Sequence, residues 1–325
     1  MGVALFALGG TISVSGRAQG ERLTGAEIAA AVPGLDRLGV ALDVRDVHAV
    51  PSGSLTFAQV LDVVDEASRA VAAGAVGVVV TQGTDTLEET AFLADLVWHH
   101  EAPFVLTGAM RQPAMAGADG PANVLAAVSV AASRAARGLG ALVAFNDEVH
   151  AARWVRKSHS TSTAAFVSAD AGPVGHLVEG EVRVFAAPPR RAALPADPDR
   201  ARLAASRVAL HCVSLDDDGG PLEGLADTHG GLVVAGFGAG HVPGPLAPVL
   251  GALARRIPVV LTSRTGGGPV LRRTYRAPGS ETDLQERGLI SGGRLDPYKA
   301  RVLLRLLLAS GAGRDEVAAA FAARG

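Results

Sequence analysis

Hydroxyl-rich loops and one isolated lysine are the residues of this chain best suited to chemistry. Only two of the 30 basic residues are lysines, Lys157 and Lys299, and Lys157 stands beside Arg156. Arginine stays protonated near neutral pH, whereas burial and neighbouring groups can lower the pKa of a lysine until it accepts a proton. A lysine near a threonine and an aspartate is one way to activate a weak hydroxyl nucleophile. The alternative is that residues 153–163 form a basic surface loop rich in Ser and Thr.

The segment 81–90, Thr-Gln-Gly-Thr-Asp-Thr-Leu-Glu-Glu-Thr, is the densest run of hydroxyl and carboxylate side chains. Helix capping explains part of it, because Asp85 or Thr86 is a good N-cap and Glu88 or Glu89 would complete a capping box. Capping does not need so many polar residues in a row. The segment therefore predicts a site for a polar, zwitterionic small molecule.

A second loop, Gly9-Gly10-Thr11-Ile12-Ser13, follows the apolar run near the N-terminus. Two glycines let the backbone turn sharply and bring its amides close to a ligand, and a hydroxyl follows them. A dinucleotide-binding loop would have a third glycine that opens a helix, whereas residues 12–17 are typical of a loop. An ordinary turn between a strand and a helix is the alternative. The segment up to Gly20, rich in Gly and Ser, could form a mobile flap.

The elements that must position these residues alternate between strand and helix. Apolar strands are expected at 3–8, 76–80, 103–106, 142–145, 208–212, 232–235 and 258–262, with two short strands within 172–185. Helices are expected at 87–99, 122–136, 245–255 and 297–309. Such alternation indicates βαβ units in parallel sheets, with ligands bound beyond the carboxyl ends of the strands.

The chain length points to two domains. Its 325 residues exceed the ~250 to 300 at which a single core usually stops growing. We expect an α/β protein with a larger N-terminal parallel-sheet domain, residues 1–187, and a smaller C-terminal α/β domain, residues 206–325. The Pro- and Arg-rich stretch within 188–205 is the expected linker.

Composition excludes several classes of protein. The chain has 30 Lys+Arg against 32 Asp+Glu, a formal net charge of -2 and 48% hydrophobic residues, which argues against nucleic-acid binding, a basic membrane patch and disorder. No apolar run approaches the ~20 residues of a membrane span. The single cysteine, Cys212, allows no intrachain disulfide, and the N-terminus lacks the basic start of a secretory signal, so a cytoplasmic location is expected. The nine histidines show no metal-binding spacing, so neither metal nor cofactor is expected.

Several blocks, in order, resemble the bacterial-type L-asparaginase and glutaminase family, and together they cover nearly the whole chain. They are Gly9 to Ser13, Gly83 to Thr90, Thr107 to Arg111, Asp119 to Asn123, Asn146-Asp147 leading to Lys157, Gly172 to Gly175, and Leu295 to Arg301. This agreement is far more specific than any single motif.

The resemblance implies hydrolysis of a side-chain amide with release of ammonia, through a covalent acyl-enzyme on a threonine. By motif, Thr11 matches the primary nucleophile, and Thr84, Asp85 and Lys157 match the second hydroxyl, the carboxylate and the base of a triad. Asp85 would also hold the α-amino group of the substrate. The division of labour between Thr11 and Thr84 stays open.

Further family positions imply how the substrate is held and how subunits meet. Ser52 and Gly53 match the loop that binds the α-carboxylate, with Ser54 as the alternative to Ser52. His241 and Glu281 match residues that reach in from a neighbouring subunit. The implied assembly is a homodimer or homotetramer with sites at subunit interfaces, acting on asparagine without nucleic acid or membrane.

The chain also departs from the family pattern near the site. A Thr, a His, a Gln and an Asn of the family are replaced by Leu8, Gln82, Gly53 and His241, and the only tyrosines, Tyr275 and Tyr298, give no clear counterpart to the lid tyrosine of many members. The main expectation is an L-asparaginase. The alternatives are a glutaminase-asparaginase of broader specificity, an amidase for a larger substrate, a non-catalytic amino-acid sensor, and a nucleotide-binding oxidoreductase.

Overall fold

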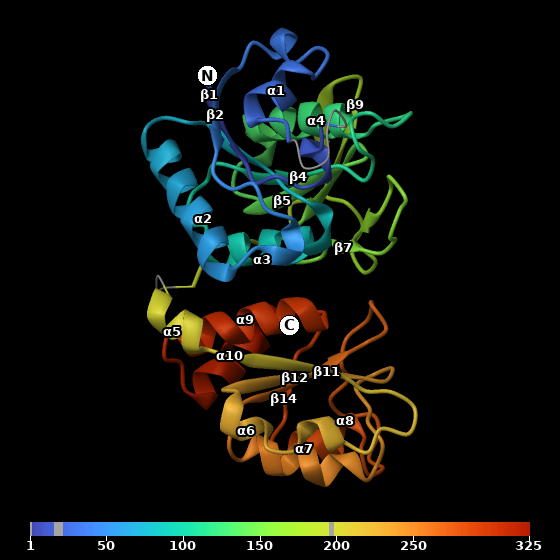
Figure 1. Cartoon of the computed structure of the whole chain (residues 1–325). Helices are drawn as coiled ribbons and strands as arrows, with labels where there is room; N and C mark the ends of the chain where they lie inside the picture. Colours follow the sequence, from blue (N-terminus) through green and yellow to red (C-terminus); the bar gives the residue numbers. More distant parts are fainter. Residues whose placement is uncertain (1, 16–21, 195–197) are drawn as a thin grey trace. The chain divides into compact units, whose positions relative to one another are not determined.

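The computed structural model describes residues 2–15, 22–194 and 198–325. Its contacts divide the chain into two compact units, Met1–Leu194 and Pro195–Gly325 (Figure 1). The expectation of a larger and a smaller α/β domain is confirmed. The expected flap lies largely at residues 16–21, outside the described residues.

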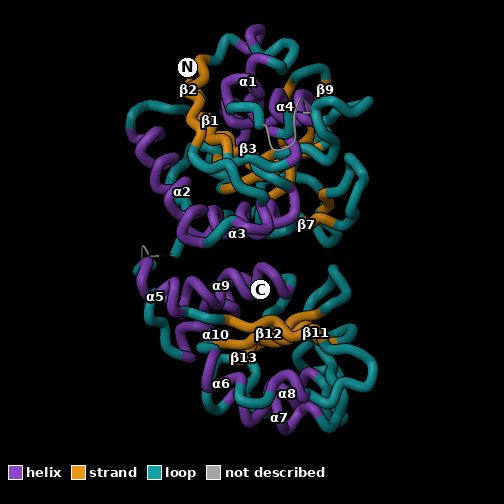
Figure 2. The backbone as a smooth tube through the Cα atoms, viewed as in Figure 1, coloured by secondary structure: helices purple, strands orange, loops and turns teal. Residues whose placement is uncertain are grey.

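Strands, orange in Figure 2, lie between helices in the first unit. They form an eight-stranded sheet in the order β10-β9-β6-β5-β4-β3-β1-β2. β1 to β5 are parallel, and β6, β9 and β10 extend the sheet in antiparallel pairing. The strands are β1 (Gly2–Ala7), β2 (Ala41–Asp46), β3 (Gly77–Thr81), β4 (Phe104–Thr107), β5 (Ala141–Phe145), β6 (Glu148–Ala151), β9 (Gly175–Val178) and β10 (Glu181–Val184). A separate small sheet pairs β7 (Arg156–Lys157) with β8 (Phe166–Val167).

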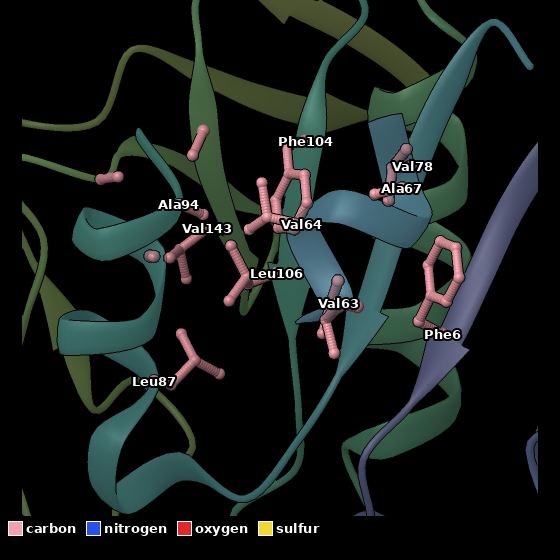
Figure 3. Close-up of a cluster of buried hydrophobic side chains, with 14 of the residues drawn as sticks. Phe6, Val63, Val64, Ala67, Val78, Leu87, Ala94, Phe104, Leu106 and Val143 are labelled. Carbon is pink, nitrogen blue, oxygen red and sulfur yellow. The ribbon is translucent and has the colours of Figure 1, made fainter. Parts of the chain in front are cut away.

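Helices cover both faces of this sheet. They are α1 (Gly25–Ala30), α2 (Phe57–Ala72), α3 (Leu87–Val97) and α4 (Gly120–Ala132), with short 3₁₀ helices η1 (Thr11–Ser13), η2 (Asp36–Leu38), η3 (Ser52–Ser54), η4 (Thr84–Thr86) and η5 (Arg134–Ala136). α2 and α3 pack on one face, where Val64 and Leu87 meet Phe104 and Leu106 (Figure 3). α1 and α4 contribute to a second cluster on the other face.

Burial of both faces explains the continuous apolar strands. In β1, Ala4 and Phe6 belong to the cluster with α2 and α3, whereas Val3 and Leu5 belong to the cluster with α1 and α4. Successive side chains of a strand point to opposite faces, so a parallel strand buried on both sides needs apolar residues at every position. The sheet is therefore a rigid platform for the loops at its edge.

The second unit is built on a parallel sheet in the order β11-β12-β13-β14. Its elements are β11 (Val208–Cys212), β12 (Gly231–Gly236), β13 (Val259–Ser263), β14 (Ile290–Ser291), α5 (Arg200–Ala205), α6 (Leu225–Thr228), α7 (Leu246–Ala254), α8 (Glu281–Glu286), α9 (Pro297–Ala309), α10 (Arg314–Arg324) and the 3₁₀ helix η6 (Gly220–Leu222). One apolar cluster joins α7 and α8 to β12 and β13.

Most of the predicted elements are present, with shifted ends. The expected helix at 87–99 ends at Val97, and the one at 122–136 ends at Ala132, before η5. α5 occupies the last six residues of the expected linker, 188–205, and the boundary between the two compact units falls between Leu194 and Pro195. The division between the two compact units therefore falls within the stretch expected to be a linker, and α5 lies inside that stretch.

Candidate active site

The two hydroxyl-rich loops emerge at the same edge of the large sheet. Thr11 follows β1 and Thr84 follows β3, and these neighbouring strands are parallel with Ala7 paired to Thr81. β1 lies between β2 and β3, so the strand order reverses there. In open α/β sheets, such a reversal opens a crevice outside the carboxyl ends of the strands, where ligands bind.

Two glycines bring these loops into direct backbone contact. A Cβ atom built on Gly10 would lie 2.2 Å from the amide nitrogen of Gly83, and Gly10 has a φ of 93°. A side chain at this position is excluded both by the clash and by the left-handed conformation. Glycine at position 10 is therefore the condition for placing Thr11 against the loop that carries Thr84.

Ser52, on η3, is joined to the second loop. Its Oγ accepts a hydrogen bond from the amide of Asp85 at 3.2 Å, and its carbonyl oxygen accepts one from the Thr86 hydroxyl at 2.9 Å. Ser52 is buried, whereas Gly53 and Ser54 are exposed. A Cβ on Gly53 would meet no atom within 4 Å, so this position leaves open space.

Lys157, on β7, reaches the same loop although it is 73 residues from Thr84 in the sequence. Its Nζ lies 2.9 Å from Thr84 Oγ1 and 2.8 Å from Asp85 Oδ1. Thr84 is 6% exposed, and the side chains of Lys157 and Asp85 are 16% and 76% exposed. The lysine amine is thus held between a buried hydroxyl and a carboxylate that solvent can reach.

The N-cap position of α3 was predicted correctly, but its side-chain capping hydrogen bonds were not. Thr86 is the N-cap residue, but its side chain makes no capping hydrogen bond and binds Ser52 instead. Glu88, in the first turn of α3, accepts a hydrogen bond from the backbone amide of Lys157. Local capping rules missed both contacts because each partner is more than 30 residues away in the sequence.

The blocks 107–111 and 119–123 support the site. Asp119 accepts hydrogen bonds from the amides of Met110 and Arg111, both at 2.9 Å. The buried Asn123 donates to the carbonyl of Gly108 at 3.0 Å and accepts from the amide of Asn146 at 3.0 Å. These side chains tie together the loops that follow β4 and β5.

In the second unit, Glu281 and His241 form a pair. His241 Nε2 lies 3.2 Å from Glu281 Oε2, and the amides of Thr274 and Tyr275 each donate to Glu281 Oε1 at 2.8 Å. The Glu281 side chain is 0% exposed and that of His241 is 32% exposed. The ring of Tyr275 packs edge-on against His241, with 4.8 Å between centroids.

These contacts favour the ionised form of the Glu281 carboxyl. Burial raises the pKa of its carboxyl, but the hydrogen bonds from the Tyr275 and Thr274 amides and from His241 outweigh burial, so the pKa is lowered overall. Glu281 is an ionised, buried group, and within this unit His241 is the more accessible member of the pair.

The structure brings together only part of the predicted site. Ser52, Thr84, Asp85 and Lys157 are joined by direct hydrogen bonds, and Thr11 is adjacent through the contact between Gly10 and Gly83. Two residues with contacts to these groups were not predicted: Glu88, which binds Lys157 in the first unit, and Tyr275, which contacts His241 and Glu281 in the second. No motif marked Tyr275, whereas Glu88 was attributed to helix capping.

The described residues contain neither a cluster suited to a metal ion nor a helix suited to a membrane span. Within the described ranges, no group of three or more His, Cys, Asp or Glu residues could hold a metal ion. Within the same ranges, no helix is long and apolar enough to cross a bilayer.

The lowered pKa of Glu281 predicts a pH-dependent stability. A carboxyl whose pKa is lower in the folded state stabilises the fold above its unfolded pKa and loses that contribution as the pH falls through the folded pKa. Glu281→Gln should therefore be less stable than the unaltered chain at pH 7, and the difference should shrink in acid below the ordinary carboxyl range. Thermal unfolding over a pH series measures this.

Glu286→Gln is the matched control, because Glu286 is an exposed residue of the same helix. Its stability should follow that of the unaltered chain at every pH. An equal effect of both substitutions would show that the buried hydrogen bonds of Glu281 are not the cause.

Known proteins share both parts of this structure. The family description "Asparaginase, N-terminal" matches residues 2–190, and "Glutaminase/Asparaginase C-terminal domain" matches residues 207–321. A protein described as probable L-asparaginase of Deinococcus radiodurans is 36% identical over 98% of this chain and 96% of its own length. An L-asparaginase of Bacillus licheniformis is 34% identical over 95% of each chain.

Broader comparisons agree. A glutaminase-asparaginase of Pseudomonas aeruginosa is 32% identical over 93% of this chain and 84% of its own length. The crystal structure of a probable cytoplasmic L-asparaginase from Campylobacter jejuni superimposes with a TM-score of 0.88, 31% identity and 99% coverage of both chains. The resemblance seen in the sequence is confirmed: the chain belongs to the asparaginase family of amidohydrolases.

Proposed function

We propose that the protein is an L-asparaginase that hydrolyses L-asparagine to L-aspartate and ammonia through an acyl-enzyme on Thr11. The observation that carries this is the contact of Lys157 Nζ with Thr84 and Asp85, beside the loop of Thr11. Membership of the family supports the reaction type. A cytoplasmic location is part of the proposal, supported by the single cysteine and by the description of the Campylobacter relative.

Two groups would bind the backbone of the amino acid. The exposed carboxylate of Asp85 would accept hydrogen bonds from the α-ammonium group. Ser52 Oγ already accepts from the Asp85 amide, and a hydroxyl retains its own proton to donate, here to the α-carboxylate. Binding at both ends would fix the distance from the α-carbon to the side-chain amide.

The chemistry would proceed by acyl transfer. Thr11 Oγ1 attacks the amide carbon, and its proton passes towards the amine of Lys157, the proposed base, with Thr84 as the adjacent hydroxyl. Thr11 and Thr84 are the first residues of η1 and η4, where backbone amides have no intrahelical acceptor. The backbone amides at these two helix starts are therefore suited to stabilising the oxyanion. The C–N bond breaks, the nitrogen takes a proton and leaves as ammonia, and water then cleaves the ester to aspartate.

Substrate choice follows from this fixed distance. Asparagine should be hydrolysed with a kcat/KM at least about 10-fold higher than glutamine, because one extra methylene displaces the amide from Thr11. Release of ammonia from both amides by one preparation measures this. Equal values would favour the broader glutaminase-asparaginase, for which the open space at Gly53 leaves room. Binding of asparagine without release of ammonia would instead indicate a sensor.

The nucleophile is tested by Thr11→Val, which keeps the shape of the side chain and removes the attacking oxygen. We expect a loss of more than about 10³-fold in kcat with an unchanged melting temperature. Mass spectrometry of quenched reactions should locate the acyl group on the peptide with Thr11 in the unaltered enzyme. An acyl group on Thr84, or a Thr11→Val enzyme with most of its activity, would contradict the assignment.

His241 and Glu281 are proposed to complete the site of another copy in a homodimer or homotetramer. Thr11→Val and His241→Ala then damage different parts of one shared site. Co-expression of the two variants should give mixed oligomers in which some sites are fully native, with more activity than the two separate preparations combined. Activity equal to their average, or an active monomer in light scattering, would rule out shared sites.

A further inference from the structure

Glu88 is a buried carboxylate that the proposed chemistry does not use. It is 6% exposed, in the first turn of α3. Removing a carboxylate from water is costly unless hydrogen bonds replace those lost. One such bond comes from the backbone amide of Lys157, 69 residues further along the chain. Interaction with the helix dipole does not require this burial, because Glu89 also places a negative charge in the first turn of α3.

The segment that carries Lys157 has little regular structure of its own. β7 has two residues, and among the described residues its partner strand is β8, also of two residues. Val155 and Phe166 anchor the segment in the core near Lys157. Since a lysine side chain has four rotatable bonds, the place of its amine depends on where the backbone is held.

Glu88, which accepts from the backbone amide of Lys157, belongs to the same helical segment as the two partners of Lys157 Nζ. Thr84 and Asp85 lie in η4, which leads directly into α3 and Glu88. The Lys157 amide donates to Glu88, and Lys157 Nζ donates to Thr84 and Asp85. Both ends of the lysine are therefore attached to one helical segment. Because the helical backbone fixes the spacing between Glu88 and Thr84, it also fixes where Lys157 Nζ lies relative to the Thr84 hydroxyl.

From this geometry we infer that Glu88 is a positioning residue for Lys157, which fixes the backbone of the lysine so that its amine meets Thr84. This rests on the proposed function. Loss of the contact should misplace the base while leaving substrate binding by Ser52 and Asp85 in place. A displacement of about 1 Å in a catalytic group can cost about 100-fold in rate.

The test compares Glu88→Ala with Glu88→Gln, because the glutamine carbonyl can still accept from the Lys157 amide. Glu88→Ala should lower kcat per folded molecule by about 10- to 100-fold, with KM for asparagine and the Kd of aspartate nearly unchanged. Glu88→Gln should retain most of the activity, and so should the control Glu89→Ala. Unchanged kcat in Glu88→Ala, or equal losses in kcat and aspartate affinity, would overturn the inference.

A second readout is independent of activity. Labelling with ¹⁵N-lysine gives only two backbone amide signals, since the chain has only Lys157 and Lys299. The Lys157 signal should move upfield in Glu88→Ala and stay in place in Glu89→Ala, and an unmoved signal would overturn the inference. If Glu88→Ala fails to fold, Glu88→Asp, whose carboxylate is one methylene shorter, takes its place in both measurements.

The two hypotheses fail in different ways. If the unaltered protein releases no ammonia from asparagine, the proposed function is wrong, whereas the lysine spectrum still decides whether Glu88 holds Lys157. If the unaltered protein is active and Glu88→Ala is equally active, only the positioning role is wrong.

Discussion

A close backbone contact between two glycines is the constraint on which the candidate site depends. Gly10 and Gly83 approach so closely that any side chain at position 10 would clash with the backbone of Gly83. The contact is possible because both strands are buried on both faces and end at the same edge. Ser52 and Lys157 are hydrogen-bonded to the loop of Gly83, Thr84 and Asp85, and the glycine contact places that loop against the loop that carries Thr11.

The sequence predicted those parts of the fold that depend on local pattern. β11 and α9 match their expected limits, because apolar runs and helical spacing determine them without long-range information. α2 was not predicted, although Val60, Val63, Val64 and Ala67 of this helix are buried at helical spacing. β7 and β8, with two residues each, have no pattern long enough to detect.

The site was less accessible to sequence reasoning than the fold. Family motifs indicated Thr84, Asp85 and Lys157, and the structure joins them by hydrogen bonds, but their catalytic roles stay predictions. The hydrogen-bond partners expected for Thr86 and Glu88 were wrong, because a capping rule considers only neighbouring residues. The actual partners lie on η3 and β7. Contacts between distant segments are set by the packing of the whole unit, which local propensity does not contain.

The proposed role of Lys157 as the base for a threonine nucleophile is tested most directly by two substitutions, Lys157→Arg and Arg156→Lys. Lys157→Arg keeps the positive charge but cannot accept a proton, while Arg156→Lys makes the reverse exchange one residue away. The measurement is kcat for asparagine in both variants, with the melting temperature as a check on folding. We expect a loss of at least about 100-fold in kcat for Lys157→Arg and nearly normal activity for Arg156→Lys. Nearly normal activity in a folded Lys157→Arg enzyme would contradict it.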